Sequence, residues 1–464
     1  MRNTHSMADG FHTRSLHAGQ TPDEATGARA PPIHQTTSYV FEDADRAADL
    51  YALDADGDVY SRISNPTTRI LEDRLADLEG GTAAVATASG MAALDSATSV
   101  LASAGDNVVA SADMYGGTAT YLTRMATRRG IDVRVVDTLD YDAYADAVDA
   151  DTAYVHVETI ANPSLKTPDF ARLAEIAHES HAPLVVDNTF ATPYLCRPIE
   201  HGADVVWEST TKWLHGSGTT VGGVLVDGGT FPWDHADYDE LSGENPAFGV
   251  DFVERYGDAA FANVARQRAL RTLGNGQSPF DAWQTLQGLE TLPLRMARHC
   301  ENARAVAAFL RDHDGVAWVS YPGFEEHPTH ANATRYLDAA DGDGAATVAA
   351  GADVDGYGGM VTFGLTAGYE AAKRACEAAD LASFLANIGD AKTLIIHPAS
   401  TTHAQLSEAE QRAAGLTPEM LRLSVGLEDT EDVVADLDQA IRRATRATGR
   451  NGATSTDGGS GGNA

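Results

Sequence analysis

Lysine is scarce in this chain, and one lysine stands where a reactive amine could work. The 464 residues contain only four lysines, Lys166, Lys212, Lys373 and Lys392. Lys212 follows the apolar run DVVW and the hydroxyl residues Ser209, Thr210 and Thr211, and a Gly-rich segment comes after it. A lysine at a strand end is usually a solvated surface residue. Here the neighbouring hydroxyls could bind a phosphate while the amine bonds to a carbonyl carbon.

Two other segments place polar groups directly after apolar runs. Asp187 ends the run LVVD, which puts a carboxylate at the C-terminal edge of a predicted sheet, where ligands gather. Ser89, Gly90 and Met91 open an apolar helix after the run AVAT, so their backbone N–H groups would face an anion. Taken singly, an ordinary cap accounts for Asp187, and a plain strand-to-helix turn accounts for the other three.

Together these groups match what pyridoxal 5'-phosphate (PLP) requires of a protein. The cofactor needs a lysine for its aldehyde, an acid against its pyridine nitrogen, donors around its phosphate and a platform for its ring. The chain supplies candidates for the first three in Lys212, Asp187 and residues 89–91. The sequence therefore predicts a PLP enzyme in which Lys212 carries the cofactor.

Two other patterns resemble cofactor or metal motifs but fail on spacing. Gly216, Gly218 and Gly222 resemble a dinucleotide-binding loop, yet Val221 occupies the place of the third glycine, which disfavours a dehydrogenase. His178 and His181 are three residues apart rather than four, so HESH is not a zinc helix. We expect no metal site and interpret HESH as the exposed end of a helix.

Composition narrows the class of protein. The formal net charge of −34 opposes binding to nucleic acid, and the acidic residues are spread along the chain. Such a surface is typical of proteins adapted to high salt, where short Debye lengths screen self-repulsion. No apolar run has the length of a signal peptide or a membrane span, so we expect a soluble, cytoplasmic protein. The three cysteines are far apart and are interpreted as ordinary buried thiols.

The elements that must position these groups follow an α/β rhythm. A helix is predicted over 67–78, and seven β-rich runs then alternate with helical segments at 84–87, 107–110, 133–136, 154–157, 184–187, 204–207 and 223–226. A loop-rich stretch over 227–260 could cover the active site or contact another subunit. A long helix with Leu294 and Leu310 on one side follows, and strands are expected near 316–321, 358–365 and 420–425. The predicted parts are an N-terminal arm (1–66), an α/β domain (67–290), an α+β domain (291–448) and a disordered tail (449–464).

Motifs along nearly the whole chain, from about residue 13 to 446, resemble the Cys/Met-metabolism family of PLP enzymes. They include HAGQ at 17–20, QTTSYVF at 35–41, YSRISNPT at 60–67, ASGMAA at 88–93, MYGGT at 114–118, ETIANP at 158–163, VVDNTFATPYL at 185–195, STTKW at 209–213, SPF at 278–280, QGLETLPLR at 287–295, HPASTTH at 397–403 and RLSVGLED at 422–429. The resemblance implies the aspartate-aminotransferase-like fold (fold type I), with a mostly parallel seven-stranded sheet and a smaller C-terminal α+β domain. It also implies a homotetramer built from dimers that share active sites.

The resemblance also implies roles for single residues. Lys212 would bond to the cofactor and move protons, Asp187 would pair with the pyridine nitrogen, and Tyr115 would stack on the ring and assist proton transfer. The phosphate would be held by Ser89, Gly90, Met91, Ser209 and Thr211, with Tyr60 and Arg62 from the neighbouring subunit. Arg422 would bind the substrate carboxylate, helped by Asn162 and Asn387. Without the resemblance, Arg422 could be a surface charge and Tyr115 a core aromatic.

Within the family, the segment 250–295 and the run NIGDAKTLIIHPASTTHAQLSEAE are most similar to O-acetylhomoserine sulfhydrylases. This implies γ-replacement on O-acetyl-L-homoserine, with sulfide or methanethiol as the nucleophile. A cystathionine γ-synthase or a cystathionine or methionine γ-lyase is the alternative, although Gly116 and Gly117 follow Tyr115 where methionine γ-lyase has a cysteine at the second position. Two departures from the family pattern leave local contacts open: HGSGTT after Lys212, and His34 before QTTSY.

Overall fold

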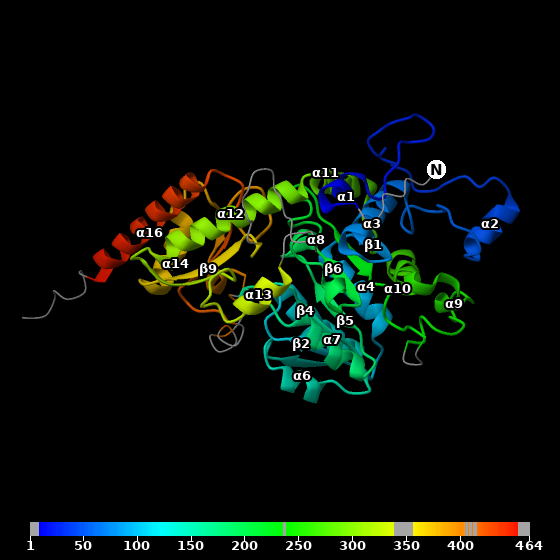
Figure 1. Cartoon of the computed structure of the whole chain (residues 1–464), viewed down its shortest axis with the longest axis horizontal. Coiled ribbons are helices and arrows are strands. Elements are labelled where there is room, and N and C mark those ends of the chain that lie inside the picture. Colours follow the sequence, from blue (N-terminus) through cyan, green and yellow to red (C-terminus); the bar gives the residue numbers. More distant parts are fainter. Residues whose placement is uncertain are drawn as a thin grey trace, which may run out of the picture.

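The larger domain is built on a seven-stranded sheet at the centre of the molecule (Figure 1). In this computed structural model the described residues are 9–234, 238–337, 356–402, 404, 407, 411 and 415–452. The strands are β1 (Ala83–Thr87), β2 (Asn107–Ser111), β3 (Asp132–Val136), β4 (Thr152–Glu158), β5 (Leu184–Asp187), β6 (Val205–Glu208) and β7 (Gly223–Asp227). They confirm all seven predicted runs.

Strand order in this sheet is β1-β7-β6-β5-β4-β2-β3. β7 runs antiparallel to β1 and β6, and the remaining neighbours are parallel. The predicted α/β fold with a mostly parallel sheet is therefore confirmed. Because β4, β5 and β6 are parallel neighbours, their last residues, Glu158, Asp187 and Glu208, meet at one edge of the sheet.

Helices cover both faces of the sheet, which explains why its strands read as continuous apolar runs. One core contains Val155, Val157 and Val186, and the helices packed there are α3 (Pro66–Glu79), α6 (Tyr141–Ala147), α7 (Phe170–Glu179) and α11 (Pro279–Leu289). The opposite core contains Tyr154 and Val185, covered by α4 (Gly90–Leu101) and α10 (Ala260–Ala265). Successive residues of a strand thus enter opposite cores, as the two-residue period requires.

Short helical segments connect these elements. They are α5 (Gly116–Thr120), η1 (Tyr121–Ala126), η2 (Thr127–Arg129), α8 (Thr192–Leu195), η3 (Pro198–His201), α9 (Phe252–Tyr256), η4 (Gly257–Ala259) and η5 (Arg266–Leu273). Asn65, Ser89 and Ser278 cap α3, α4 and α11 by accepting a backbone N–H in the first turn.

The N-terminal region is extended but contains two helices that the sequence analysis missed. They are α1 (Phe11–His17) and α2 (Ala44–Tyr51). Figure 1 shows α2 at the far right, away from the sheet. This region carries apolar side chains into solvent: Val40, in the extended part, is 100% exposed, and Tyr51, at the end of α2, is 57% exposed.

The smaller domain contains a second sheet of order β10-β11-β12-β9-β8. Its strands are β8 (Val316–Ser320), β9 (Met360–Leu365), β10 (Ser383–Phe384), β11 (Leu394–Ile396) and β12 (Met420–Ser424). The sequence predicted β8, β9 and β12, and missed β10 and β11, which are too short to show a period.

Long helices pack on this second sheet and lie at the left of Figure 1. They are α12 (Leu292–Arg311), α14 (Gly368–Ala378) and α16 (Thr430–Gly452), with α13 (His330–Tyr336) and η6 (Pro398–Ser400) as shorter pieces. Leu310 is buried, as expected, but Leu294 is exposed, so the predicted apolar side of α12 was wrong at its first turn. α16 extends to Gly452, into the predicted tail, and 453–464 lie outside the described residues.

Three aromatic residues of the loop-rich stretch over 227–260 pack at the end of the sheet opposite Asp187. Phe231, Trp233 and Tyr238 are buried in the second core. The Tyr238 hydroxyl donates to the carbonyls of Ala153 (3.2 Å) and His181 (3.0 Å), near the starts of β4 and β5. That the stretch covers an active site or contacts another subunit stays a prediction.

Gly288 fixes how α11 sits against the turn that follows Lys212. A methyl group on its Cα would lie 2.4 Å from the His215 carbonyl oxygen and 2.6 Å from that of Leu214. We expect Gly288→Ala to destabilise the protein by about 1–3 kcal/mol, because an inserted carbon must push backbone atoms apart. The control is Gly10→Ala, since nothing lies within 4 Å of a Cβ at Gly10. Thermal unfolding of both variants measures the difference, and equal melting temperatures would contradict the steric requirement.

Candidate active site

Lys212 lies half-buried in the turn after β6, with its amine directed at the smaller domain. Its Nζ donates to Oδ1 of Asn387 at 2.5 Å. Burial, and then the nearby Arg422 guanidinium, lower the pKa of Lys212 to about 8. A lysine of ordinary pKa is almost fully protonated at neutral pH, whereas this one has a sizeable neutral, nucleophilic fraction. The predicted reactive amine is therefore supported by its surroundings.

Arg422 comes from β12 of the smaller domain and meets the larger domain at the same place. Its Nη1 donates to Oδ1 of Asn162 (3.1 Å), and its Nη2 donates to the carbonyl oxygen of Asn387 (3.4 Å). Arg422 is buried, and burial lowers its pKa to about 10. Both contacts are to neutral oxygens, and the ion pairs among the described residues do not include Arg422. A buried guanidinium in such surroundings is suited to bind a carboxylate.

Asp187 ends β5 as a buried carboxyl group. Its Oδ1 accepts the backbone N–H of Thr189 at 2.9 Å. Burial raises the pKa of Asp187 to about 7. A cation held against this carboxylate would favour its ionised form, which is what a protonated pyridine nitrogen would provide.

The N-terminus of α4 and the turn before Lys212 form one concave backbone region. Ser89 accepts the Ala92 N–H as the N-cap, and Met91 lies in the first turn. A methyl group on Gly90 would lie 2.8 Å from Cβ of Ser209, so the two segments touch only because residue 90 is glycine. The Thr211 hydroxyl contacts Gly222, donating to its carbonyl (3.2 Å) and accepting its N–H (3.0 Å). Backbone N–H groups at the start of a helix beside a serine suit a phosphate.

Tyr115 is the N-cap of α5 and is 47% exposed. Its ring rests on Gly117, where an added Cβ would lie 2.3 Å from the ring carbon Cε1. Its backbone N–H donates to Glu158 at the end of β4. The ring is thus an exposed aromatic face held at the sheet edge, not a core aromatic.

Tyr60 and Arg62 do not join the other predicted site residues of the same chain. They lie on the arm, where the Arg62 guanidinium sits 5.3 Å from the centre of the Tyr60 ring. Among the hydrogen bonds and ion pairs of the described residues, none joins either side chain to Lys212, Asp187 or Arg422. Both side chains are exposed.

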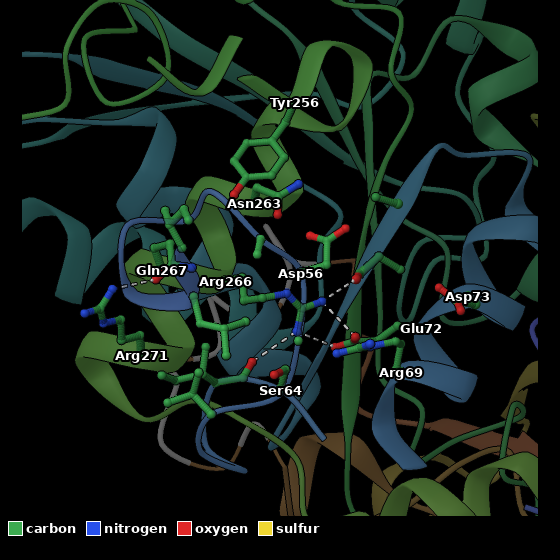
Figure 2. Close-up of a pocket in the computed structure, with 18 of the residues that line it drawn as sticks. Asp56, Ser64, Arg69, Glu72, Asp73, Tyr256, Asn263, Arg266, Gln267 and Arg271 are labelled. Carbon is green, nitrogen blue, oxygen red and sulfur yellow. Dashed lines mark hydrogen bonds and ion pairs between the residues drawn. The ribbon is translucent and has the colours of Figure 1, made fainter. Parts of the chain in front are cut away.

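A cavity of about 760 Å³ lies between the arm and the α/β domain, and Figure 2 shows its lining. Arg266 crosses it to pair with Glu72 at 2.7 Å, and Arg69 pairs with Asp58 at 2.7 Å. The lining includes none of the residues predicted to bind cofactor or substrate. We therefore do not assign the chemistry to this cavity.

Comparison with known proteins identifies the family. A family model described as Cys/Met metabolism PLP-dependent enzyme matches residues 12–442. The chain belongs to this family. The homocysteine synthase of Schizosaccharomyces pombe is 46% identical over 438 residues, covering 94% of this chain and 98% of that protein. The O-acetyl-L-homoserine sulfhydrylase of Leptospira meyeri is 45% identical over 439 residues, covering 93% and 96%.

A solved structure agrees with the family assignment. The putative O-acetylhomoserine (thiol)-lyase of Campylobacter jejuni superposes with a TM-score of 0.87 at 37% identity, covering 94% of this chain and 100% of that one. One lysine of that protein carries a pyridoxyl monophosphate group. The protein described here is a PLP-dependent enzyme of the Cys/Met-metabolism family.

The residues at the sheet edge fit this cofactor. Lys212 has a depressed pKa, Asp187 is a buried carboxyl group that a cation would ionise, and Gly90 leaves room at a helix N-terminus. Within the described residues, no group of three or more His, Cys, Asp or Glu side chains is arranged to hold a metal ion. No described helix combines the length and apolarity needed to cross a membrane. The three cysteines are free and buried, as expected.

The sequence analysis missed three buried glutamates near Asp187: Glu79, Glu158 and Glu208. Glu158 and Glu208 end apolar strands just as Asp187 does, so the same signal could have found them. Glu79, the last residue of α3, accepts Asn188 Nδ2 at 2.8 Å, and its carboxyl group is close enough to Glu208 to help raise the pKa of Glu208. Among the described residues the Glu208 oxygens have no hydrogen-bond partner. Burial and the neighbouring carboxyl group thus favour the protonated form of Glu208.

The raised pKa values of these buried carboxyl groups make stability depend on pH. Burial raises the pKa of Glu79, and burial with the Glu79 and Asp187 carboxyls raises that of Glu208. The folded protein then binds more protons than the unfolded chain, so its stability falls as pH rises above the unfolded carboxyl value of about 4.3. Glu208→Gln removes one of these titrating groups.

We therefore compare the melting temperature of Glu208→Gln with that of wild type at each pH. The difference should move in favour of the variant by several degrees between about pH 5 and about pH 8. Each kcal/mol of stability corresponds to roughly 2–4 °C. Differential scanning fluorimetry across this range measures it. Glu175→Gln, at an exposed position of α7, serves as the control and should show a pH-independent offset. A pH-independent offset for Glu208→Gln as well would contradict the raised pKa of Glu208.

Proposed function

We propose that this enzyme replaces the acetyl-bearing oxygen of O-acetyl-L-homoserine with sulfur from sulfide, giving L-homocysteine and acetate, and that methanethiol can replace sulfide to give methionine. The activities named for relatives that are 45–46% identical over nearly the whole chain carry this proposal. The adjacency of Lys212 and Arg422 supports it, because an amino-acid substrate needs a carboxylate anchor beside the reactive amine.

In the proposed reaction each residue has one task. Bound PLP supplies an electron sink next to the substrate α-carbon. Arg422 binds the substrate carboxylate, and Asn162 and Asn387 orient the guanidinium. The Lys212 amine removes the α-proton and moves protons between carbons, and the Asp187 carboxylate would hold a proton on the cofactor's pyridine nitrogen. The Cγ–O bond breaks to release acetate, and the Cγ–S bond forms with sulfide.

The cofactor's phosphate is proposed to lie between Ser89, Gly90 and Met91 on one side and Ser209 and Thr211 on the other. Tyr115 would cover the ring. The exposed arm suggests that Tyr60 and Arg62 complete this phosphate site in a second copy of the chain, within a homotetramer made of two dimers. The exposed apolar residues of the arm, Val40 above all, would then be covered.

We also propose that the protein works in the cytoplasm of a salt-adapted cell. The net charge of −34 would repel itself at low ionic strength, and salt screens that repulsion. Assays are therefore best performed at high salt.

The direct test is homocysteine formation from O-acetyl-L-homoserine and sulfide by the PLP-loaded enzyme. We expect Lys212→Ala to lose the absorbance of lysine-bound cofactor and at least about 10²-fold in turnover, because the proton-transferring amine is absent. Lys392→Ala, which alters an exposed lysine, is the matched control and should retain both. Retained turnover in Lys212→Ala would overturn the lysine assignment.

The same assay separates the alternative activities. Methanethiol, cysteine and water are offered in place of sulfide. Cystathionine as the main product would favour a cystathionine γ-synthase, and a 2-oxo acid formed with water would favour a γ-lyase. A wild-type enzyme that binds PLP and forms no homocysteine would contradict the proposed function.

The shared site is tested by mixing two inactive variants, Arg62→Ala and Lys212→Ala, under conditions that exchange subunits. If one subunit supplies Arg62 and the other Lys212, a hybrid dimer has one intact site. Random exchange should then restore about a quarter of the wild-type activity. If each subunit supplied both residues to its own site, mixing would restore none.

A further inference from the structure

Glu158 is a buried carboxyl group that holds two separate loops of the candidate site. It is the last residue of β4 and pairs in register with Asp187, the last residue of β5. Its Oε1 accepts the backbone N–H of Tyr115 at 2.5 Å. Its Oε2 accepts the backbone N–H of Asn162 at 3.0 Å. One carboxylate therefore joins a residue 43 positions before it to one 4 positions after it.

Each loop presents a side chain to a different part of the site. The Tyr115 ring lies exposed over Gly117, at the start of α5. The Asn162 side chain accepts from Arg422 at 3.1 Å, so it links this loop to the guanidinium of the smaller domain. Movement of Glu158 would displace the aromatic face and the guanidinium together.

Burying the carboxyl group of Glu158 in these surroundings costs free energy, so the side chain does more than fill space. The carboxyl groups of Asp187 and Asp113 act on it, and Lys166 is paired with Asp113 at 2.8 Å. Burial, and then Asp187, raise the pKa of Glu158. Only a carboxyl group of this length offers two coplanar oxygens to two N–H groups; glutamine offers one.

We propose that Glu158 is a positioning residue that couples the Tyr115 ring to the Arg422 carboxylate anchor by fixing both loops from one side chain. This inference rests on the proposed function for the roles of Tyr115 and Arg422. Glu158, at the end of β4, would thereby set the distance between the Tyr115 ring and the substrate carboxylate. Glu158 acts through its neighbours and does not itself contact substrate.

The test compares Glu158→Gln, Glu158→Ala and Glu179→Gln, all as PLP-loaded enzymes. Glu179 is exposed at the end of α7 and is the matched control. Amide hydrogen exchange resolved to single residues reports directly on the Tyr115 and Asn162 N–H groups. We expect both to exchange faster in Glu158→Ala, one of the two in Glu158→Gln, and neither in Glu179→Gln.

Steady-state kinetics give the second readout. We expect Glu158→Ala to lose about 10²-fold in kcat/KM for O-acetyl-L-homoserine, mainly through KM, with cofactor absorbance retained, because small misplacements of binding groups cost this much. Glu158→Gln should recover part of the loss. Wild-type exchange at both amides in Glu158→Gln, or an unchanged KM in Glu158→Ala, would overturn the proposal.

Failure of this proposal is distinguishable from failure of the proposed function. If wild type forms no homocysteine, the substrate assignment fails, whereas the exchange rates at Tyr115 and Asn162 still measure the coupling. If wild type is active and exchange is unaffected by the Glu158 variants, the coupling alone fails.

Discussion

Desolvation of charged side chains at one edge of the seven-stranded sheet governs this protein. The parallel strands β4, β5 and β6 end in Glu158, Asp187 and Glu208, and all three carboxyl groups are buried. In water these groups would be ionised and Lys212 would be protonated; here burial shifts each pKa toward the neutral form. A charged ligand that returns these groups to their ordinary charge states would therefore bind favourably at this edge.

The two domains are coupled through the same edge. Arg422 belongs to the second sheet, yet its contacts run to Asn162 of the first domain, and Asn387 contacts both Arg422 and Lys212. These hydrogen bonds join a cation to neutral oxygens, so they orient the guanidinium without neutralising it. The charge of Arg422 therefore remains available for a ligand, and the placement of the smaller domain decides where that charge points.

The opposite edge of the sheet has a different task. There the stretch after β7 buries Phe231, Trp233 and Tyr238 and closes the second core. The arm contacts the rest of the chain, for example through the Arg255–Asp54 ion pair at 2.9 Å, yet it leaves apolar side chains such as Val40 in solvent, which is unfavourable for an isolated chain. The molecule thus has a desolvated reactive edge, a packed supporting edge and an arm that exposes apolar side chains.

The local sequence pattern was sufficient to predict the strands of the main sheet. Strands buried on both faces appear as continuous apolar runs, and each run ends at a polar residue. All seven runs, Lys212 and Asp187 were found in this way, and motif resemblance supplied the family. Tertiary structure decided which buried carboxyl groups lie near one another: Glu79 stands 129 positions before Glu208 in the chain, and local spacing does not predict that the Glu79 carboxyl raises the pKa of Glu208. It also decided that Phe231, Trp233 and Tyr238 pack at the far edge and that Glu158 joins the Tyr115 and Asn162 loops. Such contacts depend on the order of the strands in the sheet. Strand order is a long-range property, so the local periodicity of apolar residues in the sequence does not predict it.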